Sequence, residues 1–128
     1  MSDRIVSVIP QTTSESQVNT RRWKRYKLDV PVRIIVHNRM KTKIADARGN
    51  ELNEGGLCVA AGLELQIGDR VEVEFTPPYS GEPVRARADV KDRNGYSYGM
   101  EFVLLESEDI ENVMQIRAAL QGMGKLIS

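Results

Sequence analysis

The sequence predicts a mainly β fold, an antiparallel barrel or sandwich of about six short strands followed by one C-terminal helix. Three observations support this prediction. Apolar and polar residues alternate with period two in several stretches between Leu28 and Leu104, as in strands with one buried face. Asn94-Gly95 is a strong signal for a tight hairpin turn. From Ser107 the apolar period changes to 3.6, which indicates a helix.

The first half of the chain is expected to hold three strands. Residues 28–37 alternate regularly and predict the first strand. Residues 41–50 carry a weaker signal for a short second strand that ends in a turn at Gly49-Asn50. A further turn at residues 54–56 leads into a nearly continuous apolar run, residues 57–61, which predicts the third strand.

The second half alternates more regularly. Strands are expected at residues 70–75, 84–91 and 96–104, and the last two form the hairpin across Asn94-Gly95. The helix is expected near residues 107–122, with Ser107 as its N-cap. The apolar stripe expected on that helix consists of Ile110, Val113, Met114, Ile116 and Leu120.

Length and composition favour one domain in a chain of 128 residues. We expect a flexible N-terminal segment over residues 1–19, the barrel and helix over residues 20–122, and a C-terminal tail over residues 123–128. No apolar run approaches the roughly 20 residues that span a bilayer, and the N-terminus lacks the pattern of a signal peptide. A cytoplasmic protein without membrane insertion is the expectation.

Several function classes are disfavoured by the side chains present. The 18 basic and 18 acidic residues balance, which argues against a nucleic-acid-coating protein. Cys58 is the single cysteine and His37 the single histidine, so neither a disulfide nor a cysteine-cluster zinc site is expected. No nucleophile, base and orienting group are recognisable together, so we expect neither an enzyme nor a bound cofactor or metal.

One local cluster of charge stands out against this balance. Five cations lie within seven residues, namely Arg21, Arg22, Lys24, Arg25 and Lys27. Arginine suits two-pronged recognition of phosphates and of guanine edges. Two arginines three residues apart, in a loop that folds over a neighbouring surface, would clamp an anionic nucleotide. The plainer interpretation of such a cluster is a solvated, charged segment.

Four segments together give a specific resemblance. They are Arg21-x-x-x-Arg25, Leu28–Val32, Glu51–Leu57 and Tyr98–Phe102. Over roughly residues 20–120 the chain resembles the PilZ domain family. The resemblance implies a six-stranded antiparallel split β-barrel with a C-terminal helix, and a domain that binds the second messenger cyclic di-GMP.

The resemblance also implies a set of ligand-binding residues. The family's Arg-x-x-x-Arg motif is matched in full, whereas its (Asp/Asn)-x-Ser-x-x-Gly motif is matched with two changes, Glu51 and Asn53. The arginines would hold phosphates and guanine acceptor edges, Glu51 and Asn53 would meet a second guanine edge, and Gly56 would permit close approach of the backbone. The implied set is Arg21, Arg22, Arg25, Glu51, Asn53 and Gly56.

Two functions from different classes follow. The first is a cyclic di-GMP receptor that orders its N-terminal loop on binding and signals to an unidentified effector protein. The alternative is a degenerate PilZ-like interaction module that binds a protein and no nucleotide, which the changes at Glu51 and Asn53 favour. A single-stranded nucleic-acid binder is disfavoured by the zero net charge.

Overall fold

The computed structural model describes residues 24–127 and contains seven strands and one helix in that range. The elements in chain order are β1 (Tyr26–His37), β2 (Thr42–Leu52), β3 (Gly56–Ala61), β4 (Arg70–Phe75), β5 (Val84–Asn94), β6 (Ser97–Phe102), α2 (Ser107–Met123) and β7 (Lys125–Leu126). Arg21, Arg22 and the segment expected to be flexible, residues 1–19, lie outside the described residues.

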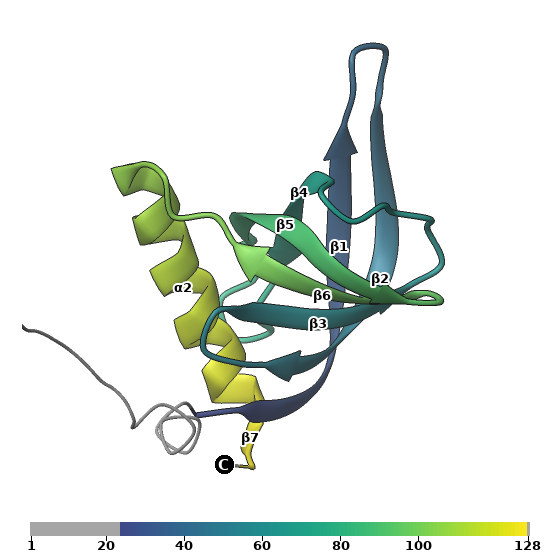
Figure 1. Cartoon of the computed structure of the whole chain (residues 1–128). Helices are drawn as coiled ribbons and strands as arrows, with labels where there is room; N and C mark the ends of the chain where they lie inside the picture. Colours follow the sequence, from purple (N-terminus) through teal and green to yellow (C-terminus); the bar gives the residue numbers. More distant parts are fainter. Residues whose placement is uncertain (1–23, 128) are drawn as a thin grey trace, which may run out of the picture.

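The first six strands close into a barrel. The pairing order is β2-β3-β6-β5-β4-β1, and β1 also pairs with β2, so the last strand of the series returns to the first. Every pairing is antiparallel. In Figure 1 the hairpin of β1 and β2 extends beyond the other strands, and α2 lies beside the barrel. The expected six-stranded antiparallel barrel with one C-terminal helix is therefore confirmed.

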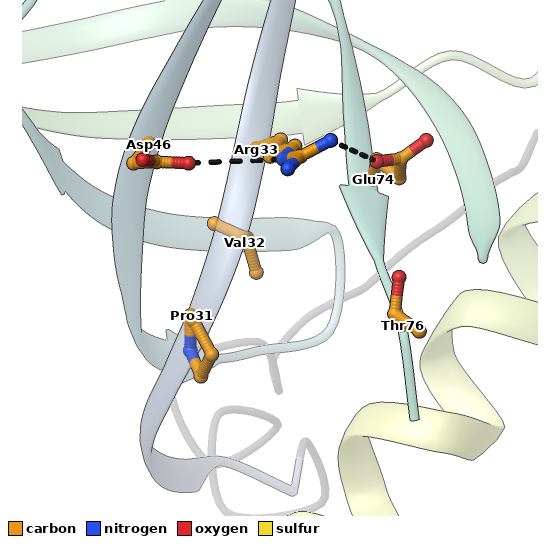
Figure 2. Close-up of a pocket in the computed structure, with 6 residues that line it drawn as sticks. All are labelled: Pro31, Val32, Arg33, Asp46, Glu74 and Thr76. Carbon is orange, nitrogen blue, oxygen red and sulfur yellow. Dashed lines mark ion pairs between the residues drawn. The ribbon is translucent and has the colours of Figure 1, made fainter. Parts of the chain in front are cut away.

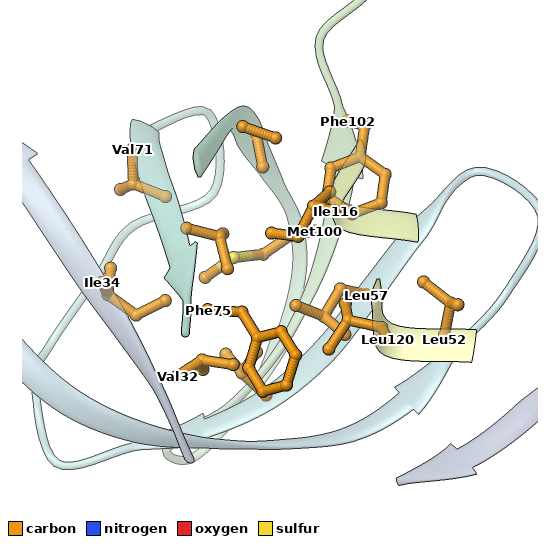
Figure 3. Close-up of a cluster of buried hydrophobic side chains, with 14 of the residues drawn as sticks. Val32, Ile34, Leu52, Leu57, Val71, Phe75, Met100, Phe102, Ile116 and Leu120 are labelled. Atoms are coloured by element: carbon orange, nitrogen blue, oxygen red, sulfur yellow. The ribbon is translucent and has the colours of Figure 1, made fainter. Parts of the chain in front are cut away.

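The core lies inside the barrel and beneath α2, as Figure 3 shows. Alternate residues of the strands point inward, so that Ile34, Val73 and Phe75 are almost fully buried. Helix α2 adds Val113, Ile116 and Leu120 to the same cluster. The alternation seen in the sequence thus arises because one face of each strand meets this core.

Gly49 and Asn50 do not form a turn, and this expectation was wrong. They lie within β2, where the pairing with β3 shifts by one residue between Gly49 and Glu51, as in a β-bulge. A Cβ on Gly49 would lie 3.3 Å from Cγ2 of Val30, so the glycine fits beneath a core side chain. The longer strand carries Glu51 onto the outer face of the barrel, opposite Cys58.

The end of the chain also differs from the expectation. The helix N-cap is Glu106 and not Ser107, and its N–H donates to Oδ2 of Asp109 at 3.0 Å. Ile110 and Met114 are exposed, because the buried stripe of α2 runs instead through Asp109, Val113 and Ile116.

Part of the expected tail is structured. Residues 125–126 form β7 and pair with residues 26–27 at the start of β1. Within residues 24–127 no helix has the length and apolar character needed to span a membrane.

Candidate ligand-binding site

The turn between β2 and β3 holds the second sequence motif. Oδ1 of Asn53 accepts hydrogen bonds from the backbone N–H of Gly55 at 3.2 Å and of Gly56 at 2.9 Å. The N–H of Asn53 donates to the carbonyl of Gly56 at 3.0 Å. Asparagine commonly closes turns in this way. Because the side-chain oxygen is engaged, the amide NH2 of Asn53 is the group free to contact a ligand.

Arg117 of α2 holds this turn from outside. Its Nη1 donates to the backbone carbonyl of Asn53 and, at 3.1 Å, to that of Glu54. Arg117 was not predicted from the sequence, because it is more than sixty residues from the motif and no local pattern distinguishes it from an ordinary surface arginine on a helix. The C-terminal helix is therefore tied directly to the motif turn.

Gly56 is buried against strand β6. A Cβ at this position would lie 1.7 Å from the carbonyl oxygen of Met100, a distance that no side chain tolerates. A glycine is required here because β3 and β6 approach each other closely. Gly56 also lines the cavity beside the turn, so strand packing and the shape of the site depend on the same residue.

The second arginine of the first motif meets the first residue of the second motif. Nε of Arg25 lies 3.2 Å from Oε2 of Glu51, and Nη2 lies 3.1 Å from Oε1. Strand pairing explains the encounter, because Lys27 of β1 lies opposite Glu51 of β2. The hydrogen bond to Glu51, followed by the attraction between the charges, raises the pKa of Arg25 above its usual value.

A row of outward-facing residues crosses four strands beside this ion pair. Glu51 lies opposite Cys58, Cys58 opposite Gly99, and Gly99 opposite Asp92. The two central residues, Cys58 and Gly99, are small, so no large side chain projects from the surface between the two carboxylates. We call this surface the floor of the site. Adjacent strands lie about 4.8 Å apart, which separates the backbones of Glu51 and Asp92 by roughly 14 Å.

A cavity of about 240 Å³ opens between this row and the motif turn. The turn contributes Asn53, Gly55 and Gly56. Strands β3, β5 and β6 contribute Cys58, Lys91, Asp92, Gly99, Met100 and Glu101. The cavity therefore joins three residues of the turn to polar side chains that the sequence analysis did not assign to a site.

Charges around the cavity are mixed. Nζ of Lys91 lies 3.5 Å from Oε1 of Glu101. Burial raises the pKa of the Cys58 thiol, and the negative charges of Glu51 and Asp92 raise it further, whereas Arg25 lowers it. The thiol thus stays protonated at neutral pH and serves as part of the floor.

A larger cavity of about 310 Å³ lies elsewhere on the barrel, between β1, β2 and β4. Figure 2 shows Arg33 there between two carboxylates, at 3.7 Å from Asp46 and 3.8 Å from Glu74. Glu74 also accepts from Nε of Arg85 at 2.8 Å. None of the proposed ligand-binding residues lines this cavity, whereas Asn53 and Gly56 line the cavity at the motif turn, so we favour the latter as the candidate binding site.

Metal ligation has no support in this part of the chain. Among residues 24–127 no group of three or more histidine, cysteine, aspartate or glutamate side chains is placed to hold a metal ion.

Comparison with known proteins gives a family and a fold. A family model described as PilZ domain matches residues 19–119. The structure is similar to the crystal structure of the PilZ domain of CeSA from a cellulose-synthesizing bacterium, with a TM-score of 0.61 and 15% sequence identity. That match covers 76% of this chain and 97% of the other, and at this identity it shows a shared fold. The comparison with curated proteins gave no significant match.

Proposed function

Because the chain belongs to the PilZ domain family, we propose that it is a regulatory domain that binds cyclic di-GMP. The observation that carries the proposal is the meeting of two motifs that are distant in sequence. Arg25 and Glu51 lie in contact on the outer face of the barrel, and the Asn53 turn with its cavity lies at the end of the same strand.

The chemistry of the site suits an anionic dinucleotide. The guanidinium of Arg25 has geometry suited to a phosphate or to the acceptor edge of guanine. We assign the same role to Arg21 and Arg22, whose segment leads into Arg25. The free amide NH2 of Asn53 supplies a donor, and Glu51 supplies an acceptor once Arg25 turns to the ligand.

Ligand binding then acts as a switch on the N-terminal segment. The arginines release the Arg25–Glu51 ion pair and contact the two phosphates of the ligand, and these contacts hold the arginine segment ahead of β1 against the barrel. Such a change follows from a higher affinity of the ligand for the ordered loop. The ordered loop presents a new surface to an effector protein, and this contact transmits the signal.

One observation favours the alternative of an interaction module that does not bind nucleotide. Glu51 already occupies two donors of Arg25, so a ligand phosphate competes with a carboxylate that is always present. The pair is partly exposed, with 49% of the Arg25 side chain accessible, and exposed ion pairs are weak. A dianionic ligand with several contacts therefore displaces it.

Calorimetric titration with cyclic di-GMP, beside GTP and a short RNA, tests the proposal. We expect cyclic di-GMP to bind, and we expect GTP and the short RNA not to bind. At a hundredfold excess over Kd the ligand should stabilise the fold by about 2.7 kcal/mol, seen as a rise in Tm. Absence of both heat and thermal shift, with a folded protein by circular dichroism, would overturn the proposed nucleotide binding and favour the alternative.

A further inference from the structure

We propose that Asp92 recognises the Watson–Crick edge of a guanine in the bound dinucleotide and determines the base specificity of this domain. Asp92 belongs to neither sequence motif. The inference rests on the proposed function, since it names the residue that distinguishes one cyclic dinucleotide from another at the same site.

The position of Asp92 is unusual for a surface carboxylate. It lies on β5 beside Gly99 of β6, and a Cβ on Gly99 would stand 2.7 Å from Oδ1 and 2.8 Å from Oδ2. The carboxylate thus lies over the backbone of Gly99, in the space that a side chain would fill. Asp92 is one of the residues that line the cavity at the motif turn.

Among the described residues, Asp92 is the carboxylate beside this site that has no cation partner. Glu51 is held by Arg25 through both oxygens, and Glu101 lies 3.5 Å from Lys91. In the described part of the chain, no side chain or backbone group forms a hydrogen bond or ion pair with the Asp92 carboxylate.

The neighbouring cation is directed elsewhere. Arg93 donates to the backbone carbonyls of Gly95 and Leu65, at 3.0 and 2.9 Å. Arg93 therefore does not occupy the Asp92 carboxylate, which lies at the cavity as an acceptor.

The chemistry of that acceptor selects guanine. The Watson–Crick edge of guanine presents two adjacent donors, N1–H and the N2 amine, and an ionised carboxylate offers two acceptor oxygens and no donor. Adenine presents an unprotonated ring nitrogen at the corresponding place, which repels a carboxylate. The low floor made by Cys58 and Gly99 leaves room for a flat base whose edge points at Asp92.

Electrostatics and hydrogen bonding predict opposite changes in affinity when Asp92 is replaced by asparagine. The ligand is a dianion, so removal of a nearby negative charge should strengthen its binding if electrostatics alone acted. Direct hydrogen bonding predicts the opposite, because the amide of asparagine offers one acceptor and one donor where two acceptors are needed. Weaker binding by Asp92→Asn therefore cannot be produced by the loss of charge.

The experiment is calorimetric titration of the full chain and of Asp92→Asn with three ligands. These are cyclic di-GMP, cyclic di-IMP, whose bases lack the N2 amine, and cyclic di-AMP. Asp46→Asn is the matched control, because it removes an exposed strand carboxylate at the other cavity. Circular dichroism confirms that each variant is folded.

We expect Asp92→Asn to weaken cyclic di-GMP binding roughly tenfold to a hundredfold and to shrink the preference over cyclic di-IMP. The control should bind as the unmodified chain does. Equal or tighter binding of cyclic di-GMP by Asp92→Asn would overturn the role of Asp92 and leave the proposed function intact. No binding by the unmodified chain would instead overturn the proposed function itself.

Discussion

Arg117 of α2 donates to the backbone carbonyl of Asn53, and this contact ties the C-terminal helix to the turn that holds the second motif. The same Nη1 reaches the carbonyl of Glu54 at 3.1 Å. Inside the turn, the N–H groups of Gly55 and Gly56 bond to the Asn53 side chain. The turn is thus stabilised both by its own side chain and by the helix.

We predict that Arg117→Ala loosens the turn while the barrel stays folded. Loss of hydrogen bonds worth about 1 kcal/mol should speed amide hydrogen exchange at Gly55 and Gly56 about fivefold and weaken ligand binding by a similar factor. Arg117→Lys should give exchange rates and an affinity between those of the unmodified chain and of Arg117→Ala, because a lysine keeps the charge with fewer directed donors. Gln115→Ala, at an exposed position of the same helix, is the control. Unchanged exchange at Gly55 and Gly56 in Arg117→Ala would refute the positioning role.

Gly56→Ala should destabilise the fold severely, whereas Gly55→Ala should not. A methyl group on Gly56 would collide with the carbonyl oxygen of Met100, and the backbone of β6 cannot move away cheaply. No atom lies within 4 Å of a Cβ built on Gly55. In chemical denaturation we expect a loss of about 3 kcal/mol or more for the first variant and less than ~0.5 kcal/mol for the second. Similar values for the two neighbours would contradict the packing seen here.

The fold was largely predictable because most of its strands have one buried face. Apolar and polar residues alternate wherever a strand has one face on the core and the other in solvent, as in β1 and β4. The bulge at Gly49 was mistaken for a turn because glycine and asparagine favour both structures. Strand β7 has two residues, which is too short to show any period. Which stripe of α2 is buried depends on the barrel beneath it, so Ile110 was misassigned.

The candidate site could be predicted only at the residues that family motifs mark. Glu51, Asn53 and Gly56 came from the resemblance, and the structure places them at the end of β2, in the turn and at the start of β3. Arg117 and Asp92 were not found, because their relation to the turn exists only after the helix and the β5–β6 hairpin have packed. An arginine on a helix and an aspartate in a strand are ordinary residues until their neighbours are known.

Acid should weaken the junction between β5 and α2 over a defined pH range. Asp109 accepts from Nε and Nη2 of Arg87 at 2.9 and 2.7 Å, and also from the backbone N–H of Leu105 and Glu106. Chiefly through the Arg87 hydrogen bonds, the pKa of Asp109 falls from 3.8 to about 2. Since the pKa is lower in the folded state, the stabilisation is present above pH 3.8 and is lost as the pH falls from about 4 to 2.

The variant Asp109→Asn isolates this dependence. Its stability should be lower at neutral pH, and the difference from the unmodified chain should shrink between pH 4 and pH 2. Denaturation midpoints measured across this range provide the test. A constant difference at every pH would show that Asp109 does not titrate with the lowered pKa.

Arg21→Ala and Arg25→Ala should each abolish measurable binding of cyclic di-GMP with little change in Tm. Arg25 lies half exposed before β1 and outside the core, and Arg21 lies outside the described residues. Each arginine contributes charge-assisted hydrogen bonds to the ligand, so we expect affinity to fall by roughly a hundredfold or more. Arg39→Ala, in the loop at the far end of β1, removes an equal charge away from the site. If all three variants bind equally well, the arginines are not the clamp.

The final prediction concerns the two departures from the family motif. In the double variant Glu51→Asp with Asn53→Ser, the carboxylate is one methylene shorter and no longer reaches both Nε and Nη2 of Arg25. The freed donors become available to a phosphate, and the serine hydroxyl still accepts one of the two turn N–H groups that Asn53 holds. Cyclic di-GMP should therefore bind roughly tenfold more tightly, measured by calorimetry.

The single variants separate the two contributions to that gain. If release of Arg25 causes it, Glu51→Asp alone should show most of the increase, and Asn53→Ser alone should show little. Glu54→Asp is the matched control, because it makes the same chemical change in the neighbouring turn, where Arg117 bonds to the backbone carbonyl of Glu54 and not to its side chain. Weaker binding by Glu51→Asp would mean that the contact of the longer carboxylate with the ligand contributes more to affinity than the release of Arg25 does. Competition between Glu51 and the phosphate for Arg25 would then not limit the affinity, and this prediction would be wrong.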